Sequence, residues 1–74
     1  MNIRKGDDIV LKSGSRMIVE SLPFNRGNVL WDDWRVAAWT EDHEYRFPIQ
    51  LIAIVEVWRG GARVDDTPQQ MELL

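Results

Sequence analysis

The chain has 74 residues, a net charge of −3 and no cysteine. This size allows one small domain, and the composition excludes disulfides and thiolate metal sites as sources of stability. No apolar leader opens the chain, and the longest apolar run, residues 51–55, is far too short to span a membrane. We therefore expect a globular, cytoplasmic protein that carries no cofactor and contacts no membrane.

The first predicted element is a β-hairpin. Residues 8–12 and 17–21 are rich in β-branched and apolar side chains, which favours two strands. The segment Ser13-Gly14-Ser15 between them is typical of a turn, in which Gly14 can adopt positive φ.

The next segment is predicted to be a loop followed by a long strand. Pro23 and Gly27 interrupt residues 23–28, which we assign to a loop. Residues 29–31 and 34–40 are then expected to form one strand, bent by a bulge at Asp32-Asp33. Two strands that turn at the aspartates are the alternative, although a tight turn there would lack the glycine that primed hairpins prefer.

A second hairpin is predicted around the polar tip at residues 41–44. If the turn centres on Asp42-His43, Thr40 faces Tyr45, Trp39 faces Arg46 and Ala38 faces Phe47. This register places Phe47 on the core face. It also places Trp39 beside a guanidinium, which is typical of a cation–π pair.

The last predicted strand covers residues 52–58. Pro48 cannot donate to a central ladder, so we expect a short helical turn or a crossing over residues 48–51. Gly60-Gly61 predicts a tight turn that pairs Val57 with Val64 and Trp58 with Arg63. Residues 67–70 resemble a capping box, which predicts the start of a short C-terminal helix.

Together these elements predict a mostly-β fold, a small SH3-like antiparallel barrel of five or six strands with a short C-terminal helical turn. The domain is expected to cover residues 1–64, and residues 65–74 to form a tail or short helix.

Residues 5–19, with their Gly-Asp pair, apolar strand, Lys-Ser-Gly turn and Met-x-Val, resemble the opening of the YodC-like family of small, uncharacterised bacterial proteins. Residues 36–42, followed by Phe47 and Leu51, are similar to the second half of that family. The resemblance spans about residues 4–55 and implies a small barrel, with no known active residues to transfer.

The same opening is similar to that of the plasmid-type dihydrofolate reductases, SH3-like chains that form an active pore as a tetramer. Their pore carries a Val-Gln-Ile-Tyr segment. Residues 49–52 of this chain have the glutamine but lack the tyrosine. This homotetrameric enzyme is a second alternative for the function.

The four tryptophans are the most informative feature for function. Each indole covers about 150–250 Å² when packed, and a chain this short has a thin core. One interpretation is that Trp39 and one other tryptophan anchor the core while the rest lie flat on the sheet. The other is an exposed protein-binding surface, for which we select Trp31, Asp32, Asp33, Trp34, Trp58 and Arg63.

No catalytic or metal site is predicted. His43 lies in an expected turn among Glu41, Asp42 and Glu44, without the spacing of a calcium loop. Asp32 and Asp33 are consecutive on an expected strand, so their side chains need not converge for acid–base chemistry.

We therefore expect a non-enzymatic binding module with a protein partner, which includes a second copy of itself in a homodimer. A phage or mobile-element inhibitor or adaptor fits the size and charge. The alternative is a small barrel that binds single-stranded nucleic acid by stacking, against which the scattered basic residues and the acids beside the tryptophans argue.

Overall fold

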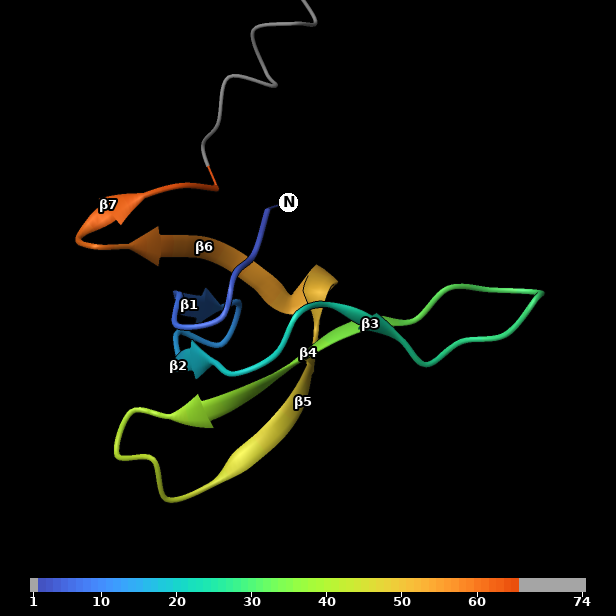
Figure 1. Ribbon diagram of the computed structural model, residues 1–74, viewed down its shortest axis with the longest axis horizontal. Coiled ribbons are helices and arrows are strands. Elements are labelled where there is room, and N and C mark those ends of the chain that lie inside the picture. Colours follow the sequence, from blue (N-terminus) through green and yellow to red (C-terminus); the bar gives the residue numbers. More distant parts are fainter. Residues whose placement is uncertain (1, 66–74) are drawn as a thin grey trace, which may run out of the picture.

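The computed structural model describes residues 2–65, which form seven strands and one short 3₁₀ helix (Figure 1). The elements in chain order are β1 (Asp8–Leu11), β2 (Arg16–Val19), β3 (Phe24–Asn25), β4 (Trp34–Thr40), β5 (Arg46–Gln50), η1 (Leu51–Ala53), β6 (Ile54–Arg59) and β7 (Ala62–Arg63).

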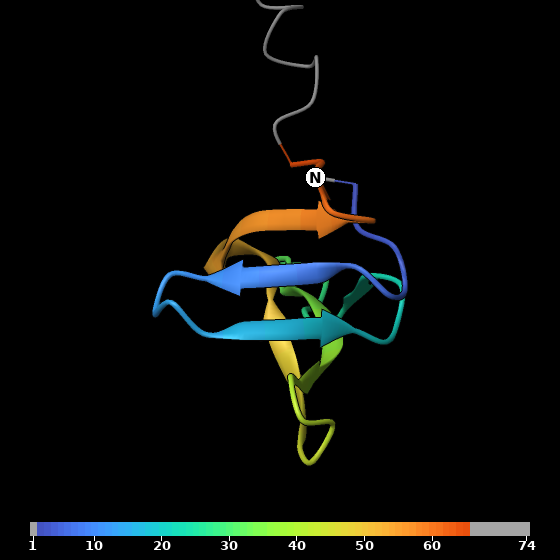
Figure 2. The same cartoon turned by 90° about the vertical axis from the view of Figure 1, so that its left-hand side faces the viewer.

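The strands form one antiparallel sheet in the order β3-β4-β2-β1-β6-β7, and β5 pairs with the other edge of β4. The sheet curls into a half-barrel, so that β1, β2 and β6 lie across from the β4–β5 hairpin (Figures 1 and 2). This confirms the predicted class of small, mostly-β barrel. The sheet has a seventh strand because the two-residue β3 lies where a loop was predicted, whereas the two-residue β7 is the strand that the Gly60-Gly61 turn predicted.

The first predicted hairpin forms, and the last hairpin has its predicted register. β1 pairs with β2 around a turn in which Gly14 has φ of 91°. β6 pairs with β7 through Trp58 and Arg63, and the amide of Val64 donates to the carbonyl of Val57. Gly60 and Gly61 both have positive φ, at 59° and 81°, which gives the turn a twist that matches its strands.

The β4–β5 hairpin also has the predicted register, with Trp39 opposite Arg46 and Ala38 opposite Phe47. Phe47 takes its predicted position opposite the buried Ala38, but its side chain is 48% exposed and does not belong to the buried core. Within residues 2–65, β5 pairs with β4 alone. The half-barrel is therefore open beside β5, and Phe47 lies at this opening.

Pro48 lies inside β5, opposite Ala37, rather than in a crossing or helical turn. An edge strand tolerates proline because its outward face needs no ladder donor. The expected helical turn follows instead as η1, which leads into β6 at Ile54.

The segment before β4 differs from the prediction. Phe24 and Asn25 form β3, which pairs with Arg35 and Trp34 of β4, so residues 23–28 are not wholly a loop. The prediction of one long bent strand is wrong at residues 29–31, because Asn28 and Trp31 form a bridge that closes a two-residue turn.

The cation–π pair predicted for Trp39 is replaced by other contacts. The Arg46 guanidinium lies 2.6 Å from a carboxylate oxygen of Glu20. The Trp39 ring lies 6.0 Å from the ring of His43, which occupies the turn with φ of 59°. The capping box at residues 67–70 lies outside the described residues.

The core is the concave side of the curled sheet, where alternate residues of four strands point inward. Its buried side chains are aliphatic and small: Ile3, Ile9, Met17, Val19, Val36, Ala38, Ile54 and Val57. No tryptophan belongs to this cluster of buried residues. The described part of the chain contains no helix long and apolar enough to cross a membrane.

A buried ion pair fastens the N-terminal segment to this core. Asp7 is 2% exposed and accepts two hydrogen bonds of 2.8 Å from the Arg59 guanidinium on β6, together with one from the backbone amide of Arg4. The Asp7 backbone also accepts from the amide of Val19, so the residue links β2, β6 and the chain start.

Candidate functional site: an apolar hairpin arm

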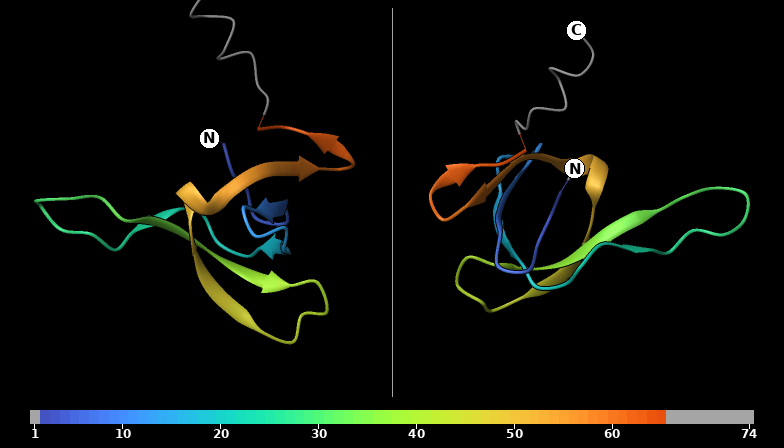
Figure 3. Two further views of the ribbon diagram at one scale, coloured as in Figure 1. Left: turned by 180° about the vertical axis from the view of Figure 1, so that it is seen from behind. Right: turned by 45° about the horizontal axis from the view of Figure 1, so that its top comes forward.

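Residues 24–35 form a hairpin, here named the arm, that projects from the half-barrel (Figure 1, and from two further directions in Figure 3). β3 and the first residues of β4 form its base. Residues 28–31 form its tip. Because β4 runs on into the sheet, the arm is anchored by a strand that belongs to the core.

The tip is a two-residue turn whose central residues are Val29 and Leu30. Asn28 and Trp31 exchange two backbone hydrogen bonds of 3.0 and 3.3 Å, and the Asn28 side chain accepts from the amide of Leu30 at 2.7 Å. Neither Val29 nor Leu30 has positive φ, so the turn is not of the primed type that requires glycine, asparagine or aspartate, and its two positions accept most residue types. Here they carry a β-branched and a long aliphatic residue.

These side chains are almost wholly exposed. Val29 is 99% and Leu30 85% exposed, and the neighbouring rings of Trp31 and Trp34 are 54% and 47% exposed. A single exposed leucine needs no explanation. Four large apolar residues together on one projecting hairpin form the type of patch that marks an interaction site.

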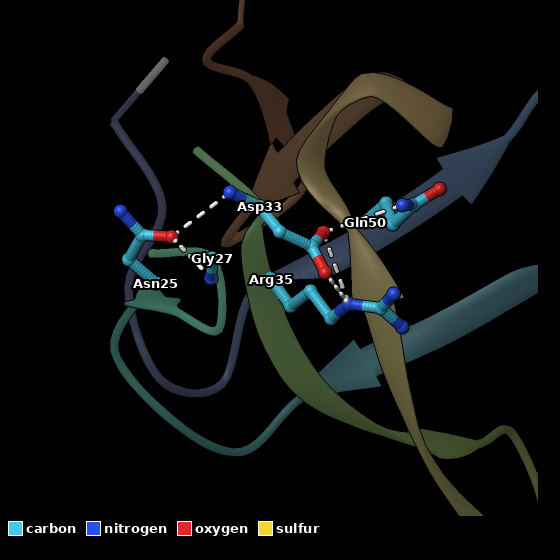
Figure 4. A network of polar contacts seen from close by, with 5 residues as sticks. All are labelled: Asn25, Gly27, Asp33, Arg35 and Gln50. Carbon is cyan, nitrogen blue, oxygen red and sulfur yellow. Dashed lines mark hydrogen bonds and ion pairs between the residues drawn. The ribbon is translucent and has the colours of Figure 1, made fainter. Parts of the chain in front are cut away.

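Polar contacts at the base hold the arm in place (Figure 4). The Asn25 side-chain oxygen accepts from the amides of Gly27 and Asp33 at 2.8 Å each, and its nitrogen donates to Asp32. The Asp33 carboxylate accepts from Arg35 at 3.0 and 3.1 Å. Asn25 therefore bridges both strands of the arm.

Gln50 on β5 adds a bond to Asp33 at 3.3 Å, which connects the arm to the edge strand. The carboxylates of Asp32 and Asp33 have different partners, Asn25 and Arg35, so they do not converge on one reacting group. Their roles in the structure are to order the arm.

Glycine is required at position 27 because the backbone of the opposite strand of the arm lies very close to it, and not because of an unusual φ. A Cβ atom there would overlap the carbonyl oxygen of Trp31 and would lie 2.9 Å from the amide nitrogen of Asp33. Both neighbours are backbone atoms, so neither can move away without reshaping the hairpin.

Trp34 faces a small hollow of about 200 Å³ at the base of the arm. Leu51 and Ile52 of η1 share this lining with Trp34, and Ile52 is 74% exposed. The exposed apolar surface of the arm thus continues onto the 3₁₀ helix.

The structure brings Trp31, Asp32, Asp33 and Trp34 together on the arm, but places Trp58 and Arg63 elsewhere. Trp58 is half-buried on β6, and its indole nitrogen donates to Glu56 at 2.9 Å. Arg63 on β7 pairs with Asp65. β6 and β7 lie at the opposite end of the strand order from β3 and β4 (Figure 1).

A second surface feature lies at the other end of β4. An open cleft of about 580 Å³ occupies the unclosed side of the half-barrel, between the β1–β2 turn and the β4–β5 hairpin. Its lining mixes apolar floor and charged rim: Leu11, Ser15, Arg16, Met17, Thr40, Glu41, Asp42, Phe47 and Ile49.

Two carboxyl groups, Asp7 and Asp42, have pKa values that their structural partners lower. Burial alone raises the pKa of Asp7, but the bonds from Arg59 and the Arg4 amide, with the guanidinium charge, lower that pKa below its ordinary value. A hydrogen bond from Thr40 lowers the pKa of Asp42, which also accepts from the amide of Glu44. In residues 2–65 no three histidine, aspartate or glutamate side chains cluster closely enough to hold a metal ion.

Sequence reasoning missed Val29, Leu30 and the cleft. The signal for the tip was present in Gly27-Asn28, a turn dipeptide, and in two asparagines whose side chains satisfy turn amides. No comparable signal exists for the cleft, since it depends on which edge of the sheet stays open.

No protein-family profile, curated protein or solved structure matches the chain. The resemblance of residues 5–19 to the YodC-like family therefore stays a prediction. The arm is identified by its own geometry.

Proposed function

We propose that this chain is a non-enzymatic binding module that docks onto another protein by inserting the tip of its arm. The observation that carries the proposal is the pair Val29 and Leu30, 99% and 85% exposed at the two positions of a tight, hydrogen-bonded turn.

Folding gives no reason for these residue types at these positions. Burying a valine or leucine side chain contributes about 1.5–3 kcal/mol, and the free chain leaves that contribution unused at both residues. A polar turn would serve the hairpin as well or better. The unused contribution becomes available when a partner covers the tip, which accounts for apolar residues at the turn.

The arm is preorganised for such binding. The Asn25 side chain connects its two strands through bonds to Asp32 and Asp33, so less conformational freedom is lost when the tip is covered. Trp31 and Trp34 beside the tip are residue types favoured as interface anchors.

The chemistry around the tip favours a protein over a nucleic acid. The Asp32 carboxylate lies next to Trp31 and is exposed, where it would repel phosphates approaching a stacking surface. The net charge of −3 adds no long-range attraction to a polyanion. A complementary partner surface is an apolar groove with basic or mixed charge at its rim.

The absence of enzymatic activity is part of the same proposal. Both oxygens of the buried carboxylate, Asp7, accept hydrogen bonds from Arg59, and one also accepts from the Arg4 amide, so this group is occupied by structural partners. The two consecutive aspartates of the arm point to different partners.

The proposal is tested by affinity purification from cells that naturally contain the protein. The wild type is compared with the double variant Trp31→Ala/Trp34→Ala and with the control Val55→Ala, which changes an apolar residue that is 41% exposed on β6. We expect the double variant to lose proteins that wild type and control retain. Retrieval of the same proteins by all three would contradict the proposal.

A further inference from the structure

We propose that the occupant of the arm is a second copy of this chain: the arm tip of each copy enters the cleft of the other, in a two-fold dimer. This inference rests on the proposed function, since it names the partner for the same tip.

The tip and the cleft are complementary in polarity. The tip presents Val29, Leu30 and one face of Trp31, all exposed. The cleft presents Phe47, 48% exposed, above Met17 and Ile49 of the open half-barrel. Its volume of about 580 Å³ is in the range that holds compact apolar groups.

The charges at the two rims also match. Arg26 and Asp32 flank the tip, whereas Arg16 stands opposite Glu41 and Asp42 in the cleft lining. One orientation of the tip pairs Arg26 with the two acids and Asp32 with Arg16. The reverse orientation would place like charges together, so the rims select one direction of entry.

The tip cannot fill the cleft of its own chain. The arm leaves the sheet at Trp34, the first residue of β4, whereas the cleft lining extends from Ile49, the partner of Val36, to Thr40 at the end of β4. The arm tip points away from the sheet, so it does not turn back towards this lining (Figures 1 and 3). A second copy is therefore needed.

The arm and the cleft lie towards opposite ends of β4, and this placement suits a two-fold arrangement. When the second copy lies antiparallel beside the first, each arm end meets the other copy's cleft end. Each tip offers about 300 Å² of apolar surface, taking about 100 Å² for each of its three side chains. One insertion covers this tip surface together with the smaller exposed lining of the cleft, and a reciprocal pair of insertions covers twice as much.

The number of surfaces left uncovered decides between the two possible assemblies. A single head-to-tail insertion would leave a free arm and a free cleft that continue into a fibre. The reciprocal dimer covers twice the area and leaves neither feature exposed, and its small interface is typical of weak association.

The test is sedimentation velocity on the full chain from about 1 μM to 1 mM. We expect a dimer with a dissociation constant in the micromolar range, and Leu30→Asp to weaken it at least about a hundredfold because the substituted hot spot occurs twice. Phe47→Asp should weaken it likewise. Val55→Asp, an acid at a matched exposed position on β6, should leave it unchanged.

Mixing the two weakened variants gives a result that misfolding cannot produce. Phe47→Asp keeps an intact arm and Leu30→Asp an intact cleft, so an equimolar mixture should form a heterodimer with one good insertion. Because the chain has no cysteine, Val29→Cys on one copy and Ser15→Cys on the other should form a disulfide, while Val29→Cys and Val55→Cys should not.

Monomeric wild type at 1 mM would overturn this inference, as would a dimer that Phe47→Asp leaves intact or a failure of Val29→Cys to link with Ser15→Cys. If the wild type is monomeric but Leu30→Asp still loses proteins retrieved from cells, a different protein occupies the arm. The proposed function then survives without this inference. If neither self-association nor retrieval depends on the arm, both fail.

Discussion

Removal of the Asp7 carboxylate should destabilise the whole domain. Asp7→Ala deletes the acceptor of two guanidinium bonds from Arg59 and of the bond from the Arg4 amide, in a site that is 2% exposed. The change would release the N-terminal segment, which contributes Ile3 to the core.

The magnitude follows from where each partner lies. Removing one member of a buried pair costs about 3–5 kcal/mol when the other charge stays buried. The Arg59 side chain is 30% exposed, so its guanidinium can turn towards water, and we expect a smaller loss for Asp7→Ala of about 2–3 kcal/mol. A domain of this length has about 3–10 kcal/mol in total, so the midpoint of thermal unfolding should fall by about 10–20 °C.

Urea unfolding followed by tryptophan fluorescence measures this loss. The matched control is Glu20→Gln, which removes the carboxylate of the exposed pair with Arg46 and should cost less than about 1 kcal/mol. Equal losses for Asp7→Ala and Glu20→Gln would refute the argument that burial makes the Asp7 pair important.

Three further changes test other parts of the structure. Gly27→Ala should weaken partner binding and lower the free energy of unfolding by about 1–3 kcal/mol, because the added Cβ overlaps the Trp31 backbone and reshapes the arm; a binding constant unchanged in titrations would contradict this. Ile9→Ala, at a fully buried site, should lose about 2–5 kcal/mol in urea unfolding, whereas Ile52→Ala, 74% exposed, should lose almost nothing. The pKa of Asp7 is lowered in the folded chain, so the ionised carboxylate contributes fully to the free energy of unfolding above the unfolded carboxyl pKa of about 3.9, and this contribution is lost as pH falls through the folded pKa. Asp7→Asn should therefore flatten this part of the curve of stability against pH. A curve identical to that of wild type would refute the role given to Asp7.

The sequence was informative where local chemistry decides the structure. Gly14 and the pair Gly60-Gly61 identified two turns, and those turns determined which residues face each other across the β1–β2 and β6–β7 hairpins. The polar segment 41–44 did the same for β4 and β5. In each case the turn fixes the first pair of facing residues, and the alternation of side chains along the strands then fixes the pairs farther from the turn.

The predictions that failed concern features that depend on contacts between distant parts of the chain. Phe47 has the inward position that its register predicts, but the sheet stays open beside β5, and no local pattern reports which edges close. Val29-Leu30-Trp31 has the composition of a strand, and the Asn28 and Asn25 side chains override that preference by satisfying turn and arm amides. The predicted exposure of Trp31 and Trp34 is confirmed, since core size limits what can be buried. It gave no means of placing Trp58 relative to them.

The central claim is that the arm tip is the surface through which this chain binds. The direct measurement is the dissociation constant of its complex, with a second copy or with a retrieved protein, for wild type, Leu30→Asp and Val55→Asp. We expect Leu30→Asp to bind at least about thirtyfold more weakly, since a hot-spot residue contributes about 2 kcal/mol or more, and Val55→Asp to bind as wild type does. Equal affinity of all three proteins would contradict the claim.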